Sequence, residues 1–318
     1  MTLGPTEKAS KKTPAFPRLG YTLRDLNGAK IYSPQISNAK GERRVEMGKR
    51  KDRMLLGAGA FSNHRSLGDL PHLLSFVGYQ VDILVMPEFS GCFDDSGNQR
   101  IDPSLVGGVI HSHKLAQRWI NRYKEVTQAW ILENLEDHPL LGGFSMGGAG
   151  ALIAYKALPE ELQTRVGGLF LAAPALAISA FEGPRGWLKR YLLLPLAASL
   201  GLTQKRRTPH VDGILSQDIT HLATRPMGAN LAICKVVEEA VRSMKPLKNK
   251  NPSVLLFDPE KTDQTVSARA GESVRETFSS VTPVVFKDGH WVFATMEGRR
   301  GELINLVKTF ADRGVAST

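Results

Sequence analysis

The chain has 318 residues, of which 42% are hydrophobic and 23% charged, a composition that excludes wholesale disorder and allows one large domain or two small ones. Its two cysteines, Cys92 and Cys234, are too few for a disulfide framework and form no C-x-x-C pattern, which points to a reducing compartment. The formal net charge is +10, but residues 1–53 alone carry thirteen Lys and Arg against five Asp and Glu. The basic character therefore belongs mainly to the N-terminal region.

The first twenty residues combine Lys8, Lys11 and Lys12 with three prolines and have no apolar core of a secretion signal, so we expect a flexible basic leader over 1–20. No stretch reaches the ~20 consecutive apolar residues that a membrane span needs. These features predict a cytoplasmic protein. They do not predict nucleic-acid binding, because no motif or aromatic interleaving accompanies the basic leader.

Predicted strands and helices alternate along the chain. The turn pair Asn27-Gly28 predicts a hairpin over Tyr21–Ile36. Further strands are predicted over 54–56, 79–86, 139–142, 166–173, 253–257 and 281–286, and helices over 66–77, 104–136, 146–158 and 302–313. Short buried strands alternating with helices indicate βαβ units, so the predicted fold class is α/β, with a mainly parallel sheet flanked by helices.

One long stretch interrupts this rhythm. Between about Pro174 and Pro252 the sequence predicts helical and apolar segments but no strand. We therefore expect one α/β core over 21–174 and 252–318, with a helical cap inserted at 175–251.

The sharpest motif is the G-x-S-x-G stretch Gly143-Phe144-Ser145-Met146-Gly147, which lies between the predicted strand at 139–142 and the predicted helix at 146–158. Such a motif arises by chance in about one chain in ten of this length, so its context decides. A strand followed by a helix rich in Gly and Ala is the setting of a nucleophile elbow, where a strained turn exposes the serine hydroxyl. The sequence therefore favours Ser145 as a nucleophile.

A serine nucleophile needs a base, and the chain offers eight histidines. His290 follows the last predicted strand, whose carboxyl end faces the same crevice as the elbow in a doubly wound sheet. His111 and His113 are two residues apart in a predicted helix and so lie on different faces, which argues against a metal pair. His64 keeps some interest because it follows the first core strand.

Three acidic residues follow the strand at 253–257 and could orient the histidine: Asp258, Glu260 and Asp263. Asp263 is favoured because the residues after it resemble a helix entry, and Asp258 is the runner-up. The order Ser145, Asp263, His290 is the α/β-hydrolase order.

With these residues in place the chain resembles the α/β-hydrolase superfamily, above all monoglyceride lipases and bacterial lysophospholipases or esterases with a helical cap. The resemblance implies that Ser145 is the nucleophile, His290 the base and Asp263 its orienter, with no cofactor and no metal. It implies an oxyanion hole made of the amides of Met146 and Ala58. Phe61 competes with Ala58, because the loop after the first core strand is longer than usual and Leu56 replaces the usual histidine.

The stretch Phe181–Leu202 is strongly apolar and carries basic residues within and just after it. It could line an acyl-chain pocket, lie in a membrane interface or pack as a buried cap helix. We expect a medium- or long-chain acyl ester as substrate, contacted by Phe61, Trp187 and Leu192.

The predicted activity is hydrolysis of carboxylic esters such as monoacylglycerol or lysophospholipid through an acyl-enzyme, with a small-molecule substrate and peripheral membrane contact through the cap. Alternatives on the same scaffold are thioester hydrolysis, small-peptide hydrolysis, acyl transfer, and a catalytically silent binding module. A dinucleotide-binding fingerprint fails, because Ser62 stands where its third glycine belongs. The sequence does not fix the oligomeric state.

Overall fold

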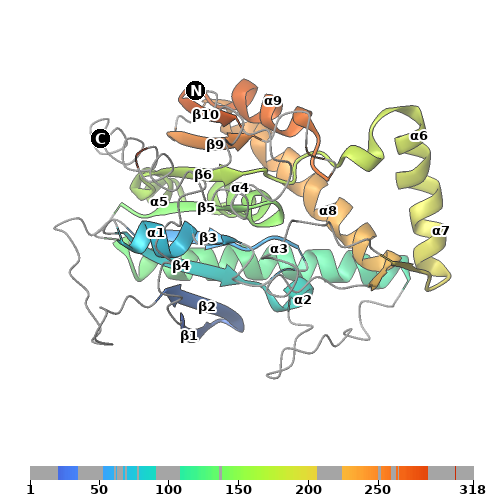
Figure 1. The fold of residues 1–318 in the computed structure, drawn as a ribbon, viewed down its shortest axis with the longest axis horizontal. Helices are drawn as coiled ribbons and strands as arrows, with labels where there is room; N and C mark the ends of the chain where they lie inside the picture. Colours follow the sequence, from blue (N-terminus) through green and yellow to red (C-terminus); the bar gives the residue numbers. More distant parts are fainter. Residues whose placement is uncertain are drawn as a thin grey trace, which may run out of the picture.

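The structure is a computed structural model that describes residues 21–34, 53–60, 62, 67–68, 70–76, 79–90, 108–135, 138–205, 224–249, 252–258, 263, 265–285 and 305. In these parts of the chain, eight strands form one sheet in the order β1-β2-β4-β3-β5-β6-β9-β10 (Figure 1). The strands are β1 (Tyr21–Leu26), β2 (Ala29–Pro34), β3 (Arg53–Gly57), β4 (Gln80–Val85), β5 (Leu140–Phe144), β6 (Gly168–Ala172), β9 (Val254–Asp258) and β10 (Val281–Val285).

The six strands from β4 to β10 run parallel, whereas the β1–β2 hairpin joins β4 antiparallel at one edge. The predicted α/β class with a mainly parallel sheet is therefore confirmed. The predicted strands are also confirmed, with shifts of one or two residues at their ends. Because all parallel strands end at the same rim, the loops after β3, β5, β6 and β9 share one side of the molecule.

Helices cover both faces of this sheet (Figure 1). They are α1 (Leu70–Phe76), α2 (Pro87–Ser90), α3 (Val109–Leu132), α4 (Met146–Ala157), α5 (Glu160–Arg165), α6 (Gly183–Leu188), α7 (Leu194–Ser199), α8 (Met227–Met244) and α9 (Ala268–Thr277). One buried cluster joins α3, α4 and α8 to one face of the sheet, and a second joins α1 to the other. Strand β3 shows the alternation that this requires, since Leu55 belongs to the first cluster and its neighbours Met54 and Leu56 to the second.

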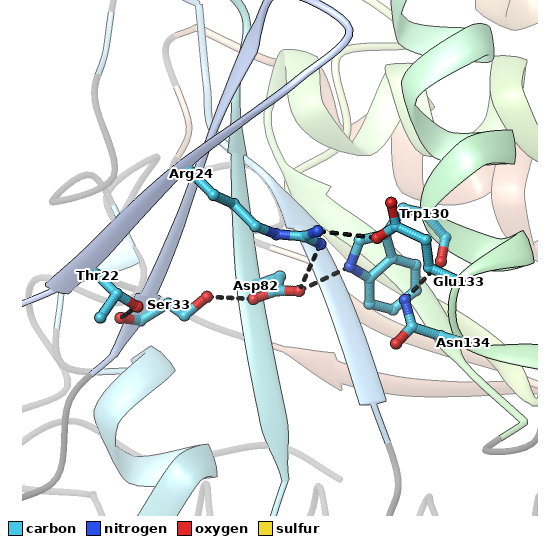
Figure 2. Close-up of polar contacts among 7 residues, drawn as sticks. All are labelled: Thr22, Arg24, Ser33, Asp82, Trp130, Glu133 and Asn134. Atoms are coloured by element: carbon cyan, nitrogen blue, oxygen red, sulfur yellow. Dashed lines mark hydrogen bonds and ion pairs between the residues drawn. The ribbon is translucent and has the colours of Figure 1, made fainter.

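The predicted N-terminal hairpin is present. Asn27 and Gly28 have φ values of 50° and 75°, the left-handed pair that a two-residue hairpin turn requires. Figure 2 shows how the hairpin is attached to the core: the Asp82 carboxylate on β4 accepts hydrogen bonds from Ser33 and, at 2.7 Å, from the indole nitrogen of Trp130. Arg24 of β1 reaches the same carboxylate at 3.5 Å.

The segment between β6 and β9 contains α6, α7 and α8 and also two short strands, β7 (Thr203–Lys205) and β8 (Thr224–Pro226). These two strands pair antiparallel in a sheet of their own, where the sequence predicted only helices. Helix α8 packs against α3 and α4 and contributes to the main core. The exact bounds of a separate cap remain a prediction. In the described residues, no helix is both long and apolar enough to cross a bilayer.

Candidate active site

Ser145 lies at the apex of a sharp turn between β5 and α4, at the carboxyl end of a central strand. Its backbone has φ 54° and ψ −115°, a combination that a residue with a side chain rarely adopts and that costs about 1–3 kcal/mol. The surroundings hold it there: its N–H donates to Ala172 at 2.8 Å, and its carbonyl accepts from Ala149 at 3.2 Å and from Ala175 at 2.9 Å. A nucleophile elbow needs such a strained conformation, held in place by hydrogen bonds to the N–H and the carbonyl of the serine.

The glycines around Ser145 allow the turn to pack directly on the end of β3. A Cβ atom at Gly147 would lie 2.1 Å from the carbonyl oxygen of Gly57, and one at Gly143 would lie 2.4 Å from the carbonyl carbon of Gly147. Neither position therefore tolerates a side chain without movement of the backbone. These contacts give a physical reason for two of the glycines that the motif analysis singled out.

Tyr123 of α3 contacts the elbow at Gly147. Its hydroxyl donates a hydrogen bond of 3.0 Å to the carbonyl of Gly147, and a Cβ atom at Gly57 would lie 2.2 Å from the hydroxyl oxygen. The residue is 2% exposed, and burial raises the pKa of its hydroxyl well above the ordinary value, so it stays a donor. The sequence analysis missed Tyr123. Helical spacing from Trp119 marks it as a core position, but the spacing does not reveal what its hydroxyl contacts.

The start of α4 supplies amides suited to a developing negative charge. Met146 is the first residue of this helix, where backbone N–H groups have no partner within the helix and the helix dipole favours an anion. The amide of Ala58 is already engaged, because it donates to the carbonyl of Leu84 at 2.9 Å. Ala58 could therefore serve an oxyanion only by giving up this bond. Phe61, the competing donor, lies outside the described residues.

Asp263 is fixed by its own loop and by the segment that follows β6. One carboxylate oxygen accepts from the amides of Thr265 at 2.6 Å and Val266 at 3.0 Å, and its carbonyl accepts from the Ser179 hydroxyl at 3.4 Å. The side chain is buried. The same segment after β6 also bonds Ser145 through Ala175, so one stretch of backbone links the Asp263 loop to the elbow.

Asp258, the runner-up, has a different environment. Its carboxylate is buried at the end of β9 and forms an ion pair with Arg275 of α9. Gly271 of the same helix leaves the room for it, since a Cβ atom there would lie 2.1 Å from an Asp258 oxygen. This arrangement ties α9 to β9, which is a structural task, and the choice of Asp263 as the functional carboxylate remains a prediction.

Of the remaining predicted site residues, some lie outside the described part of the chain and others lie within it. His290, the predicted base, lies outside the described residues, as do His64 and Phe61. Trp187 and Leu192, expected to contact an acyl tail, lie on the α6–α7 segment and are 61% and 57% exposed. Their contact with a substrate remains a prediction, as do the pairing of Ser145 with His290 and of His290 with Asp263.

Known proteins resemble this chain in fold. No protein-family model matches the chain. No curated protein sequence matches it either. Among solved structures, one attributed to LipS and LipT, two metagenome-derived lipolytic enzymes, has a TM-score of 0.58 at 15% identity. The match covers 83% of this chain and 94% of that one.

Two further structures are monoglyceride lipases. A soluble variant of the Saccharomyces cerevisiae enzyme, solved with a substrate analog, has a TM-score of 0.57 at 13% identity, over 94% of this chain and 98% of that one. The monoacylglycerol lipase of Paleococcus ferrophilus has a TM-score of 0.53 at 17% identity, over 83% of this chain and 96% of that one. At such identities the likeness establishes the fold and not the substrate. The strand order, the strained serine turn and these neighbours together show that the chain has the α/β-hydrolase fold.

Proposed function

We propose that the protein is a serine hydrolase that cleaves carboxylic esters of lipid-like acyl groups, such as monoacylglycerols or lysophospholipids. The observation that carries the proposal is the backbone of Ser145, whose φ of 54° is maintained by three backbone hydrogen bonds at the rim of a parallel sheet. At a serine without a role this strain would only destabilise the fold. At a nucleophile it has a purpose, because the strained turn exposes the hydroxyl for attack.

In the proposed reaction the Ser145 hydroxyl attacks the acyl carbonyl while the imidazole of His290 accepts its proton. The C–O bond to the alcohol then breaks, His290 returns the proton to the leaving oxygen, and the acyl group stays on Ser145. Water, deprotonated by His290, attacks this acyl-enzyme and releases the acid, and the proton returns to Ser145. Asp263 holds the imidazole in its tautomer and stabilises the imidazolium.

The oxyanion of each tetrahedral intermediate would be held by the amide of Met146 and by a second amide from the loop after β3. One such donor contributes about 3–4 kcal/mol to lowering the barrier. Because the Ala58 amide is bonded to Leu84, the second donor is proposed to come from further along this loop, where Phe61 stands as the alternative.

The acyl preference is proposed from two observations. Several structural neighbours are described as lipolytic enzymes or monoglyceride lipases, and the α6–α7 segment presents exposed apolar side chains that suit a long acyl chain or a lipid surface. We further propose a cytoplasmic location, since Cys234 is a free thiol of the kind that a reducing compartment maintains. The exposed apolar side chains of the α6–α7 segment support peripheral membrane contact.

The test combines a covalent probe with a substrate panel. A fluorophosphonate probe is expected to label the full-length protein and to leave the Ser145→Ala variant unlabelled, with equal folding checked by circular dichroism. Monoacylglycerols, lysophospholipids, acyl thioesters and p-nitrophenyl esters of increasing chain length then rank the substrates. Undiminished labelling of Ser145→Ala would refute the nucleophile, and a preference for acetyl over longer chains would refute the acyl-lipid assignment.

A further inference from the structure

Residues Gly183–Ser199 form one helical rod at the edge of the molecule, composed of α6, a π-helical turn η5 (Lys189–Leu193) and α7 (Figure 1). The π-helical turn ends at Leu193, two residues before Pro195, which is the second residue of α7. Proline has no N–H to donate and crowds the carbonyl four residues before it, so a widened turn at this point relieves both problems. Gly201, with φ 66°, ends the rod: its N–H donates to Ala198, and that of Leu202 donates to Ala197.

Within the described part of the chain, the rod contacts the rest of the protein along a narrow line. Leu194 and Ala198 are buried against Leu231 and Cys234 of α8. Arg190 lies on the same line and pairs with Glu238 of α8 at 2.9 Å. The other sides of the rod face solvent.

The solvent side is nevertheless apolar. Its main side chains, called here the outer apolar face, are Trp187 (61% exposed), Tyr191 (50%), Leu192 (57%), Leu193 (49%), Leu196 (54%) and Leu200 (65%). Such a concentration of large apolar side chains on one short segment of a surface marks a contact site rather than scattered exposure. Buried packing, one of the three interpretations of the sequence, is therefore wrong for these residues.

The charged residues within this segment of the sequence have one sign. From Gly183 to Lys205 the sequence contains no Asp or Glu, whereas Arg185 and Lys189 are exposed on the rod and Lys205 follows it. The rings of Trp187 and Tyr191 on the same segment lie 5.5 Å apart. Leucines on one side, with Trp, Tyr and basic residues at the border, are the pattern of helices that lie in a membrane interface.

We propose that the outer apolar face inserts into the surface of a bilayer that contains anionic lipids, with the rod lying parallel to the membrane plane. A lipid surface fits better than a second copy of the chain, because two such faces in contact would bring Arg185 and Lys189 of both copies together. The rod is about 25 Å long, shorter than a bilayer's hydrocarbon core, which agrees with lying on the membrane rather than crossing it. The rod also begins shortly after Ala175, whose N–H donates to Ser145, so a short stretch of chain connects it to the elbow.

The proposal is tested with the catalytically silent Ser145→Ala protein, so that binding is measured without hydrolysis. Flotation with vesicles of phosphatidylcholine and phosphatidylglycerol is expected to recover this protein, less so with phosphatidylcholine alone or in 0.5 M salt. Adding Leu193→Ser, Leu196→Ser and Leu200→Ser should weaken binding by at least about tenfold. The matched control, Leu23→Ser with Leu132→Ser, removes apolar side chains of 55% and 51% exposure elsewhere and should bind normally.

All variants keep the basic leader, so vesicle binding that survives the triple substitution would assign binding to the leader and overturn the proposal. Light scattering without lipid provides a second check. If the protein is a dimer and the triple substitution makes it monomeric, a second copy covers this face. That result would also overturn the membrane proposal. Failure of vesicle binding with intact fluorophosphonate labelling would leave the proposed hydrolase activity standing.

Discussion

The hydroxyl of Tyr123 donates a 3.0 Å hydrogen bond to the carbonyl of Gly147, which joins the middle of α3 to the first turn of α4. Gly147 is two residues after Ser145, and its Cα packs against the carbonyl of Gly57. The tyrosine therefore fixes the elbow against both the neighbouring helix and the end of β3. We expect Tyr123 to act as a positioning residue, through Gly147.

Replacing Tyr123 with Phe removes this bond while keeping the ring. One buried hydrogen bond contributes about 1 kcal/mol, so we expect kcat to fall about fivefold with KM unchanged, because the elbow is less well positioned for attack. The measurement is steady-state hydrolysis of a p-nitrophenyl ester. Tyr155→Phe is the control, since Tyr155 is equally buried on α4 and no described contact joins its hydroxyl to the elbow. Equal rates in both variants would argue against positioning by Tyr123.

Gly147→Ala introduces a Cβ atom 2.1 Å from the Gly57 carbonyl oxygen, so the turn must move away from β3. Overpacking of this kind costs about 1–3 kcal/mol of unfolding free energy, and we expect at least a tenfold loss of fluorophosphonate labelling rate. Gly108→Ala serves as control, because its nearest neighbour would be Ser199 at an ordinary 3.6 Å. That change should cost less than about 1 kcal/mol and leave labelling intact. Full labelling of Gly147→Ala would mean that the turn tolerates displacement.

The two candidate carboxylates are separated by a pair of isosteric substitutions. Asp263→Asn keeps an oxygen for the amides of Thr265 and Val266 but removes the charge that supports an imidazolium, so kcat should fall by about a thousandfold or more with little loss of stability. Asp258→Asn instead breaks the ion pair with Arg275 and should cost about 2 kcal/mol in urea unfolding while kcat stays within a few-fold. The reverse pattern would assign the orienting role to Asp258.

The main sheet and its hairpin could be predicted from sequence because their strands and turn have local causes. Buried runs such as 54–56 and the Asn27-Gly28 turn determine strands and the hairpin without reference to distant residues. The elbow was found for the same reason, since strand, G-x-S-x-G and small residues are contiguous. The predicted parallel class also implied that the loops after the strands share one rim, whereas the strand order came from the structure.

Contacts between distant residues could not be predicted in this way. The bond from Tyr123 to Gly147, the Ala58 amide engaged by Leu84 and the Asp258–Arg275 pair each depend on which side chains the packing brings together. The short β7–β8 pair was missed because three-residue strands give no periodicity. Apolar content predicted a cap, but only the structure distinguishes its buried line from its exposed face.

Asp82 is a stability determinant that the motif analysis did not detect. Its carboxylate accepts from Trp130 and Ser33 and lies near Arg24, so Asp82→Ala leaves a buried indole N–H without its acceptor (Figure 2). We expect a loss of about 2–3 kcal/mol in urea unfolding, with an unchanged rate per folded molecule. Glu133→Ala, which removes only the exposed partner of Arg24, should cost less than about 1 kcal/mol. Equal losses would place the stabilisation in the surface pair instead.

Cys234 offers a readout of how firmly the α6–α7 rod is held. The thiol is 1% exposed beneath Leu194 and Ala198, and burial raises its pKa to about 12 despite the nearby Arg190. Because the thiolate is the reacting form, a Cys92→Ser protein at pH 8 should react with Ellman's reagent at least about a hundredfold more slowly than the same protein in guanidinium. Anionic vesicles should leave this slow rate unchanged if the rod docks as a rigid unit. Acceleration by vesicles would instead mean that the rod leaves α8 when it meets lipid.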